Sequence, residues 1–156
     1  MSRRDQIRLS DDEIRDYLSE KKTLILTSNG HDGFPHSMPM WFSVDDEGAL
    51  CMTTFAKSQK VKNLQRDPRC TLLAESGVEY AELKGVAMYG SAEIIEEQDR
   101  IVDTLIAASA GGAPDDPEQR EALRASMARS ASKRVLLRVR PDRVVSWNHS
   151  KLGGVY

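Results

Sequence analysis

The sequence predicts an α+β fold, mainly β, in which antiparallel strands form a closed or partly closed barrel flanked by short helices. About six segments are rich in β-branched and aromatic residues, and Gly, Asn and Asp cluster between most of them, as in hairpin turns. The chain of 156 residues has the size of one domain with one core. Closure removes exposed sheet edges, so we expect a barrel of about six strands in a Greek-key-like order, with residues 1–156 as its single domain.

The first third of the chain predicts a short helix followed by an antiparallel meander. Ser10 and Glu13 have the spacing of a capping box, and apolar residues then recur at helical spacing. Asn and Gly at 29–33 and acidic residues before Gly48 favour chain reversals. The expected strands are residues 23–28, 35–44 and 49–54.

The rest of the chain returns twice to strand character. The expected elements are a helix at 58–66, strands at 70–74 and 85–95, helices at 96–109 and 117–131, and a strand at 134–147. Pro68 stops the first of these helices, Gly77 is expected to mark a turn, and Gly90 is expected to mark a bulge or a close approach of backbone. Residues 111–116 are expected to form a loop between the two later helices.

Composition excludes several classes of function. Lys and Arg number 22 against 24 Asp and Glu, so the net charge of −2 provides no overall field for nucleic acid or an anionic membrane. No segment has the length of a signal peptide or a membrane span, and we expect a cytoplasmic protein. Cys51 and Cys70 lie in apolar segments with no Cys or His at ligand spacing. Both are expected to be reduced core thiols, and no metal site is expected.

One helix start carries the wrong charge for its own dipole. Acidic residues stabilise the positive N-terminus of a helix, whereas each lysine there costs about 0.3–1 kcal/mol. The helices beginning near residues 11, 96 and 117 open with acids, but the helix at 58–66 opens with Lys57, Lys60 and Lys62. Ser58 is a good N-cap candidate. An anion bound by Lys57, Ser58 and Lys60 would explain this arrangement, and phosphate fits best.

Two other interpretations of the lysine cluster stay open. The lysines can belong to a solvated surface helix, the usual meaning of a single run of charge. Arg66 and Arg69 extend the basic stretch, so nucleic-acid binding by this helix is conceivable, although the rest of the chain offers little positive charge to support it. The contrast with the acidic starts of the other helices favours the anion site.

Several segments, in order, resemble the pyridoxamine 5'-phosphate oxidase-like, FMN-binding split-barrel family. These segments are Asp32-Gly33-Phe34-Pro35-His36, Pro39-Met40-Trp41-Phe42, Gly48-Ala49-Leu50, Thr53-Thr54, residues 57–69 with Asn63-Leu64 and Asp67-Pro68-Arg69, and Gly90-Ser91-Ala92-Glu93-Ile94. The ending from Pro141 through Trp147 to Tyr156 is similar to the deazaflavin (F-420)-dependent branch of the family. Together the segments cover most of the chain.

This resemblance implies a homodimeric split β-barrel with two equivalent cofactor sites at the subunit interface. It implies that Lys57, Ser58, Gln59 and Lys60 hold the cofactor phosphate. It also implies that Pro39, Met40, Trp41, Thr53 and Thr54 line the cofactor, and that the partner subunit adds residues around Tyr80 and from Trp147 to His149.

A flavin or deazaflavin supplies its own hydride chemistry, so the protein needs to bind and orient it rather than provide a nucleophile or metal. The chain has no Gly-x-Ser-x-Gly elbow, Walker-type loop or His pair at zinc spacing. His36, Tyr80 and His149 are candidate proton donors, although His36 can be an ordinary strand residue and Trp41 and Trp147 can be core or interface aromatics.

The ending of the chain favours F-420 as the cofactor and hydride transfer to a small unsaturated molecule as the reaction, with FMN as the alternative. A non-catalytic carrier of a cofactor or haem is a further possibility.

Overall fold

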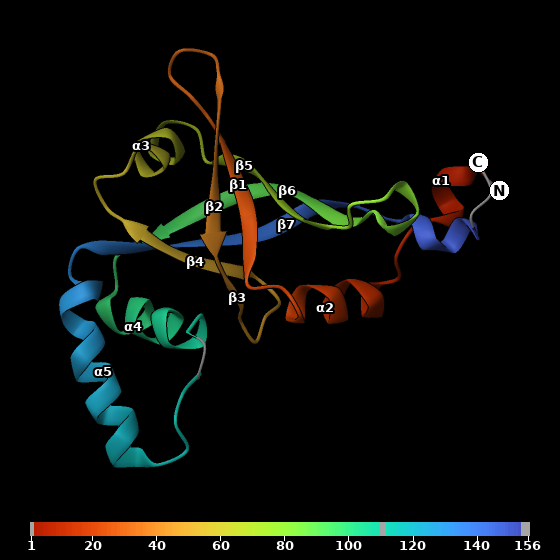
Figure 1. The fold of residues 1–156 in the computed structure, drawn as a ribbon. Helices are drawn as coiled ribbons and strands as arrows, with labels where there is room; N and C mark the ends of the chain where they lie inside the picture. The colour runs from red at the N-terminus through yellow and green to blue at the C-terminus, as the bar shows by residue number, and fades with distance from the viewer. Residues whose placement is uncertain (1, 110–111, 154–156) are drawn as a thin grey trace.

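The computed structural model describes residues 2–109 and 112–153 and contains one antiparallel sheet with helices at its ends (Figure 1). The seven strands follow the order β2-β1-β5-β6-β7-β4-β3. They are β1 (Thr23–Asn29), β2 (Pro35–Trp41), β3 (Ser43–Val44), β4 (Leu50–Phe55), β5 (Arg69–Ser76), β6 (Lys84–Ile95) and β7 (Arg134–Asn148). The predicted fold class is therefore confirmed.

The count of seven strands instead of about six has a local cause. The strand predicted at 35–44 is divided at Phe42, whose backbone N–H donates to the carbonyl oxygen of Lys22 at 3.3 Å, just before the first residue of β1. After this residue the chain leaves β1 and pairs as β3 with β4, Ser43 opposite Cys51. One predicted strand thus becomes two strands with different partners.

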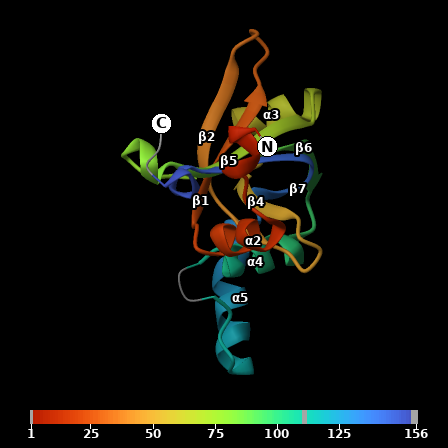
Figure 2. The same cartoon turned by 90° about the vertical axis from the view of Figure 1, so that its right-hand side faces the viewer.

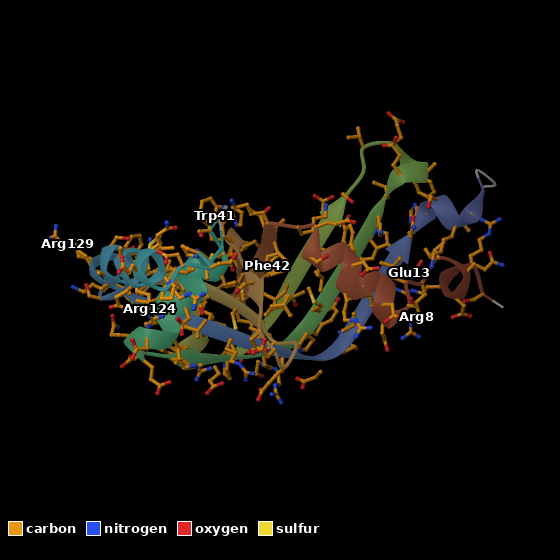
Figure 3. The ribbon with its side chains drawn as sticks, turned by 90° about the horizontal axis from the view of Figure 1, so that it is seen from below. Arg8, Glu13, Trp41, Phe42, Arg124 and Arg129 are labelled. Atoms are coloured by element: carbon orange, nitrogen blue, oxygen red, sulfur yellow. The ribbon has the colours of Figure 1, made fainter. Side chains whose placement is uncertain are left out.

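The sheet curls because its two edge strands are consecutive in the chain. β2 and β3 stand at opposite edges of the strand order, yet Phe42 alone separates them in sequence. The two edges must therefore approach each other at this residue, and the sheet is a barrel that is split between β2 and β3. Figure 3 shows Trp41 and Phe42 following one another at this junction.

The four predicted helices are all present, together with further short ones. They are α1 (Arg3–Gln6), α2 (Asp11–Ser19), α3 (Gln59–Arg66), α4 (Gln98–Ala107), α5 (Pro117–Ala131) and the 3-10 turns η1 (Tyr80–Glu82) and η2 (His149–Leu152). The capping box of Ser10 and Glu13 is present, and α5 has the predicted bounds. The short α1 was not predicted. No described helix combines the length and apolar character that a membrane crossing requires.

The core has an inner and an outer part. The inner part fills the curled sheet with alternate residues of its strands, and Val61 and Leu64 of α3 pack into it. The outer part joins β4 and β7 to α4, with Ile101 fully buried. Cys51 and Cys70 are free and buried, as predicted, and burial raises the pKa of each thiol to about 11.

The elements at the two ends of the sheet are well separated. Figure 1 shows α3 at one end of the sheet and the turn before β6, together with the end of β7, at the other end. Seen along the sheet, α5 extends away from the barrel on the side opposite to the tip of the β1–β2 hairpin (Figure 2). Of the loop predicted at 111–116, Gly111 lies outside the described residues, as do residues 154–156.

Candidate functional site

The start of α3 has no side-chain cap, which is also true of α4, whereas α1, α2 and α5 are capped by a side chain. Ser58 occupies the N-cap position with extended backbone, as predicted, but its side chain accepts no hydrogen bond from the first turn. Ser10 and Asp116 do cap α2 and α5 in this way. The Ser58 hydroxyl lies instead 3.4 Å from Thr54 Oγ1. The first backbone N–H groups of α3 therefore remain available to an external acceptor.

Lys60 is a half-buried cation beside these N–H groups. Its Nζ donates to Thr54 Oγ1 at 3.2 Å, and within residues 2–109 and 112–153 no carboxylate lies within 4.0 Å of it. Burial lowers the pKa of the Lys60 ammonium from its usual value. Lys57 is exposed in the turn that precedes the helix. Thr54, Ser58 and Lys60 thus form a small cluster of donors, which we call the cationic cluster.

The side chain of Gln59, the first residue of α3, is hydrogen-bonded to Asn63, which is in turn hydrogen-bonded to Ser28. Asn63 and Ser28 are both buried. Gln59 Nε2 donates to Asn63 Oδ1 at 2.9 Å, and Asn63 Nδ2 donates to Ser28 Oγ at 3.1 Å. The sequence prediction included Gln59 but missed Asn63 and Ser28. Both are polar residues at positions where the pattern calls for an apolar one: Ser28 faces the same side of β1 as Leu24 and Leu26, and Asn63 lies on the buried face of α3. This position within an apolar pattern was the sequence signal that could have identified them.

The predicted cofactor-lining strands present only some of their side chains. Met40 belongs to the inner core and is 8% exposed, whereas Pro39 and Trp41 on either side of it are exposed. The Met40 side chain therefore lines the core. Thr54 joins the cationic cluster, while Thr53 lies on the opposite face of β4.

The remaining predicted site residues lie together at the far end of the sheet. The rings of Tyr80 and His149 are 4.3 Å apart, and His149 Nδ1 lies 2.9 Å from Tyr80 O. Trp147 covers Gly85 on the neighbouring strand so closely that a Cβ at Gly85 would lie 2.3 Å from the indole. A single chain therefore does not bring these residues to the cationic cluster (Figure 1).

His36 lies beside the residues that support the start of α3, because its cross-strand neighbour Ser28 is hydrogen-bonded to Asn63. It pairs with Ser28 across β1 and β2 and is partly buried. Its Nδ1 is buried and has no hydrogen-bond partner in the described structure. An imidazole nitrogen without an acceptor is best left unprotonated, so the proton of neutral His36 belongs on Nε2.

Two hollows on the described surface lie away from the cationic cluster. One of about 1140 Å³ is bordered by α2, the β2–β4 connection and the end of α4, and one of about 680 Å³ lies over β1, β5, β6 and β7. Neither contains Lys57 or Lys60. We place the candidate anion site at the cationic cluster because a phosphate needs charge and donors rather than a deep cavity. No group of three or more His, Cys, Asp or Glu in the described ranges is arranged to hold a metal.

Comparison with known proteins identifies the fold family. The sequence pattern of the family described as pyridoxamine 5'-phosphate oxidase matches residues 10–148. The chain belongs to this family. Its members include oxidoreductases and bind flavins such as FMN. No curated protein is significantly similar to the chain in sequence.

Solved structures agree with this assignment. A conserved hypothetical protein, Rv2991, from Mycobacterium tuberculosis is 36% identical, with a TM-score of 0.85 over 100% of this chain and 95% of that chain. An F420 reductase is 21% identical, with a TM-score of 0.55 over 78% and 87% of the two chains. The heme storage protein HutZ from Vibrio cholerae is 16% identical, with a TM-score of 0.59 over 90% and 97%. The last two likenesses show the fold alone.

Proposed function

We propose that this protein is a homodimeric, cytoplasmic oxidoreductase that uses the deazaflavin F-420 to reduce a small unsaturated substrate. The observation that carries the proposal is the half-buried Lys60 ammonium, which has no carboxylate partner among the described residues and lies next to an uncapped helix start. This donor set fits a phosphate group, which would add the missing negative charge. Lys57, Ser58 and Gln59 complete the proposed phosphate site.

The protein residues have three tasks in this proposal. Lys60 and the first turn of α3 bind the phosphate. The Thr54 hydroxyl accepts a hydrogen bond from Lys60 Nζ and so holds this ammonium group near the start of α3. Pro39, Trp41 and Thr53 supply surface for the rest of the cofactor, as the family resemblance implies. When bound, the deazaflavin would supply hydride chemistry.

His149 is the best-prepared proton donor among the three candidates. A carbonyl oxygen only accepts, so the 2.9 Å contact with Tyr80 O fixes the proton of neutral His149 on Nδ1. Nε2 then carries the free lone pair, so it can take up a proton, and His149 donates from Nε2 to a substrate only when both ring nitrogens are protonated. Within one subunit, the elements that carry His149 and the cationic cluster lie at opposite ends of the sheet (Figure 1). The two groups can therefore act at one site only if a second subunit contributes one of them.

Support for F-420 over FMN comes from the resemblance of residues 147–154 to the deazaflavin-dependent branch and from the shared fold of an F420 reductase. FMN is the alternative, since its terminal phosphate suits the same donors.

A non-catalytic carrier is the second candidate function. The fold shared with a heme storage protein favours it, because a similar barrel there serves storage. A carrier binds F-420, FMN or haem tightly without turnover.

The experiment is a titration of the purified protein with F-420, FMN and haem, followed by addition of quinones, enones and tetrapyrroles to the reduced complex. The proposal predicts F-420 binding at micromolar concentration and oxidation of reduced F-420 by at least one substrate. Binding without oxidation supports the carrier, preferential binding and turnover of FMN support the alternative cofactor, and binding of none of the three contradicts all of these functions.

A further inference from the structure

Asn63 is a fully buried polar side chain in the middle of α3. It is 0% exposed, and its carboxamide bridges Ser28, which is 1% exposed, and Gln59, which is exposed. Its neighbours in the helix, Val61 and Leu64, belong to the inner core. Asn63 thus connects the barrel interior to the surface at the start of the helix.

Such a bridge is not the simplest way to fill this part of the core. A buried carboxamide must be hydrogen-bonded to offset its desolvation, and Asn is a poorer helix former than Leu. A leucine at position 63 together with an alanine at position 28 would fill the space with neither cost. The residue therefore calls for an explanation other than packing.

The geometry supplies that explanation through Gln59. Residues at i and i+4 of a helix lie on the same face, so Asn63 is directly behind Gln59. Gln59 is also the residue between the N-cap Ser58 and Lys60, in the first turn. One N–H of its carboxamide is engaged by Asn63 Oδ1. The other N–H and the carbonyl oxygen of Gln59 remain available, and their orientation is fixed because the side chain cannot rotate without breaking this bond.

We propose that Asn63, anchored by Ser28, is a positioning residue that holds Gln59 as a fixed hydrogen-bond donor to the bound phosphate. This inference rests on the proposed function of the α3 start as a phosphate site. A fixed donor binds more tightly than a free one, because no side-chain rotamer freedom is lost on binding. Asn63 itself touches no ligand.

The test compares dissociation constants of F-420 and FMN for wild-type protein, Asn63→Leu, Gln59→Met and the double variant. We expect about tenfold weaker binding for each single variant, and no further loss in the double variant, because Asn63 acts only through Gln59. Asn63→Leu should lower the melting temperature modestly, because the buried Ser28 hydroxyl loses its partner, and adding Ser28→Ala to it should restore most of that loss. Gln65→Leu, an exposed change on the same helix, is the matched control and should bind as wild type.

Ser28→Ala provides a second, milder way to release Asn63 if Asn63→Leu does not fold. It should also weaken binding, and adding Gln59→Met should again cost nothing more. Unchanged affinity in folded Asn63→Leu or Ser28→Ala, or additive losses in either double variant, would overturn the positioning role alone. If wild-type protein binds neither cofactor, the proposed function fails and the inference fails with it.

Discussion

Lys60 pairs a half-buried ammonium group with a hydroxyl instead of a carboxylate. The residue is therefore unfavourable for the free protein in two ways: burial lowers its pKa, and its charge opposes the helix dipole. Both effects are relieved by a bound anion. A residue of this kind is expected where binding, rather than stability, has determined the side chain.

We predict that Lys60→Met leaves the free protein as stable as wild type or raises its free energy of unfolding by about 0.3–1 kcal/mol. Urea unfolding in phosphate-free buffer measures this. The added stability that F-420 gives to the wild type should be lost in the variant. Lys62→Met, an exposed neighbour on the same helix, should keep that gain. A marked loss of stability in Lys60→Met without ligand would instead mean that the lysine is structural.

Asp67 is the residue whose ionisation the fold uses most directly. It accepts hydrogen bonds from Asn29 at 2.8 Å and from Arg69 at 2.8 and 2.9 Å, which tie the β1–β2 hairpin to the start of β5. Arg69, followed by Asn29, holds the pKa of the Asp67 carboxyl far below its usual value.

Because the folded-state pKa of Asp67 is depressed, its contribution is complete above the unfolded value near 3.8 and is lost as pH falls through the folded value. We predict that Asp67→Asn has a lower melting temperature than wild type at pH 7 and that the difference narrows below about pH 3.8. Melting curves from pH 7 to pH 2 test this, with the exposed Asp142→Asn as control. A difference independent of pH would contradict it.

At the scale of elements, the contact between β6 and β7 at Gly85 shows how one strand shapes its neighbour. Trp147 lies over Gly85, where any side chain would enter the indole ring. The absence of a side chain at Gly85 therefore determines where the Trp147 ring lies, two residues before His149 in the chain.

We predict that Gly85→Val displaces the Trp147 ring and lowers the free energy of unfolding by about 1–3 kcal/mol, as overpacking does. The displacement should shift Trp147 fluorescence, recorded in a Trp41→Phe background so that one tryptophan remains. The exposed Ala81→Val should leave the emission unchanged. An unshifted spectrum in Gly85→Val would mean that the ring is not held by this contact.

Elements with local signals were predictable from the sequence. The capping box of α2, the bounds of α5 and the register shift at Gly90 all follow from residues a few positions apart. The break at Phe42 was not predictable, because it depends on a hydrogen bond to Lys22 across the sheet. The helix α1 was missed because it buries no side chain, although Ser2 and Asp5 form its capping box.

Some residues of the candidate site were likewise predictable from local sequence, and others were not. The charge of the α3 start is a property of consecutive residues, so the sequence alone indicated Lys57, Ser58 and Lys60. The contact between Lys60 and Thr54, the bridge from Asn63 to Ser28 and the inward side chain of Met40 each depend on how elements pack. No local pattern specifies them.

At the scale of the whole molecule, the split barrel separates the groups that the proposed chemistry needs. The start of α3 is at one end of the sheet, and η1 and the end of β7, which carry Tyr80 and Trp147 and lead into His149, are at the other end (Figure 1). Outside the barrel, Arg124 of α5 donates to Asp99 of α4 at 3.0 Å and helps to fix the α4–α5 pair (Figure 3). The proposed dimer would bring the cationic cluster of one subunit next to Tyr80, Trp147 and His149 of the other.

This arrangement predicts complementation between two inactive subunits. Lys60→Met and His149→Ala should each lack activity, whereas a refolded equal mixture should regain about one quarter of wild-type activity, because half of the dimers are mixed and each has one intact site. Activity with reduced F-420 in the mixture measures this. The two single variants, each refolded alone, are the controls. No recovery in mixed dimers would contradict a shared site.

The central claim is that the start of α3 binds the phosphate of a redox cofactor, and direct calorimetric titration with F-420 and FMN tests it most directly. The measurement compares wild type with Lys57→Ala/Lys60→Ala and with a control of equal charge change, Lys62→Ala/Lys133→Ala, at two exposed lysines. The account predicts micromolar binding to wild type and control and at least about a hundredfold loss in the Lys57 and Lys60 variant, since two charge-assisted contacts are removed. Equal affinity of all three proteins, or binding of neither cofactor to the wild type, would contradict it.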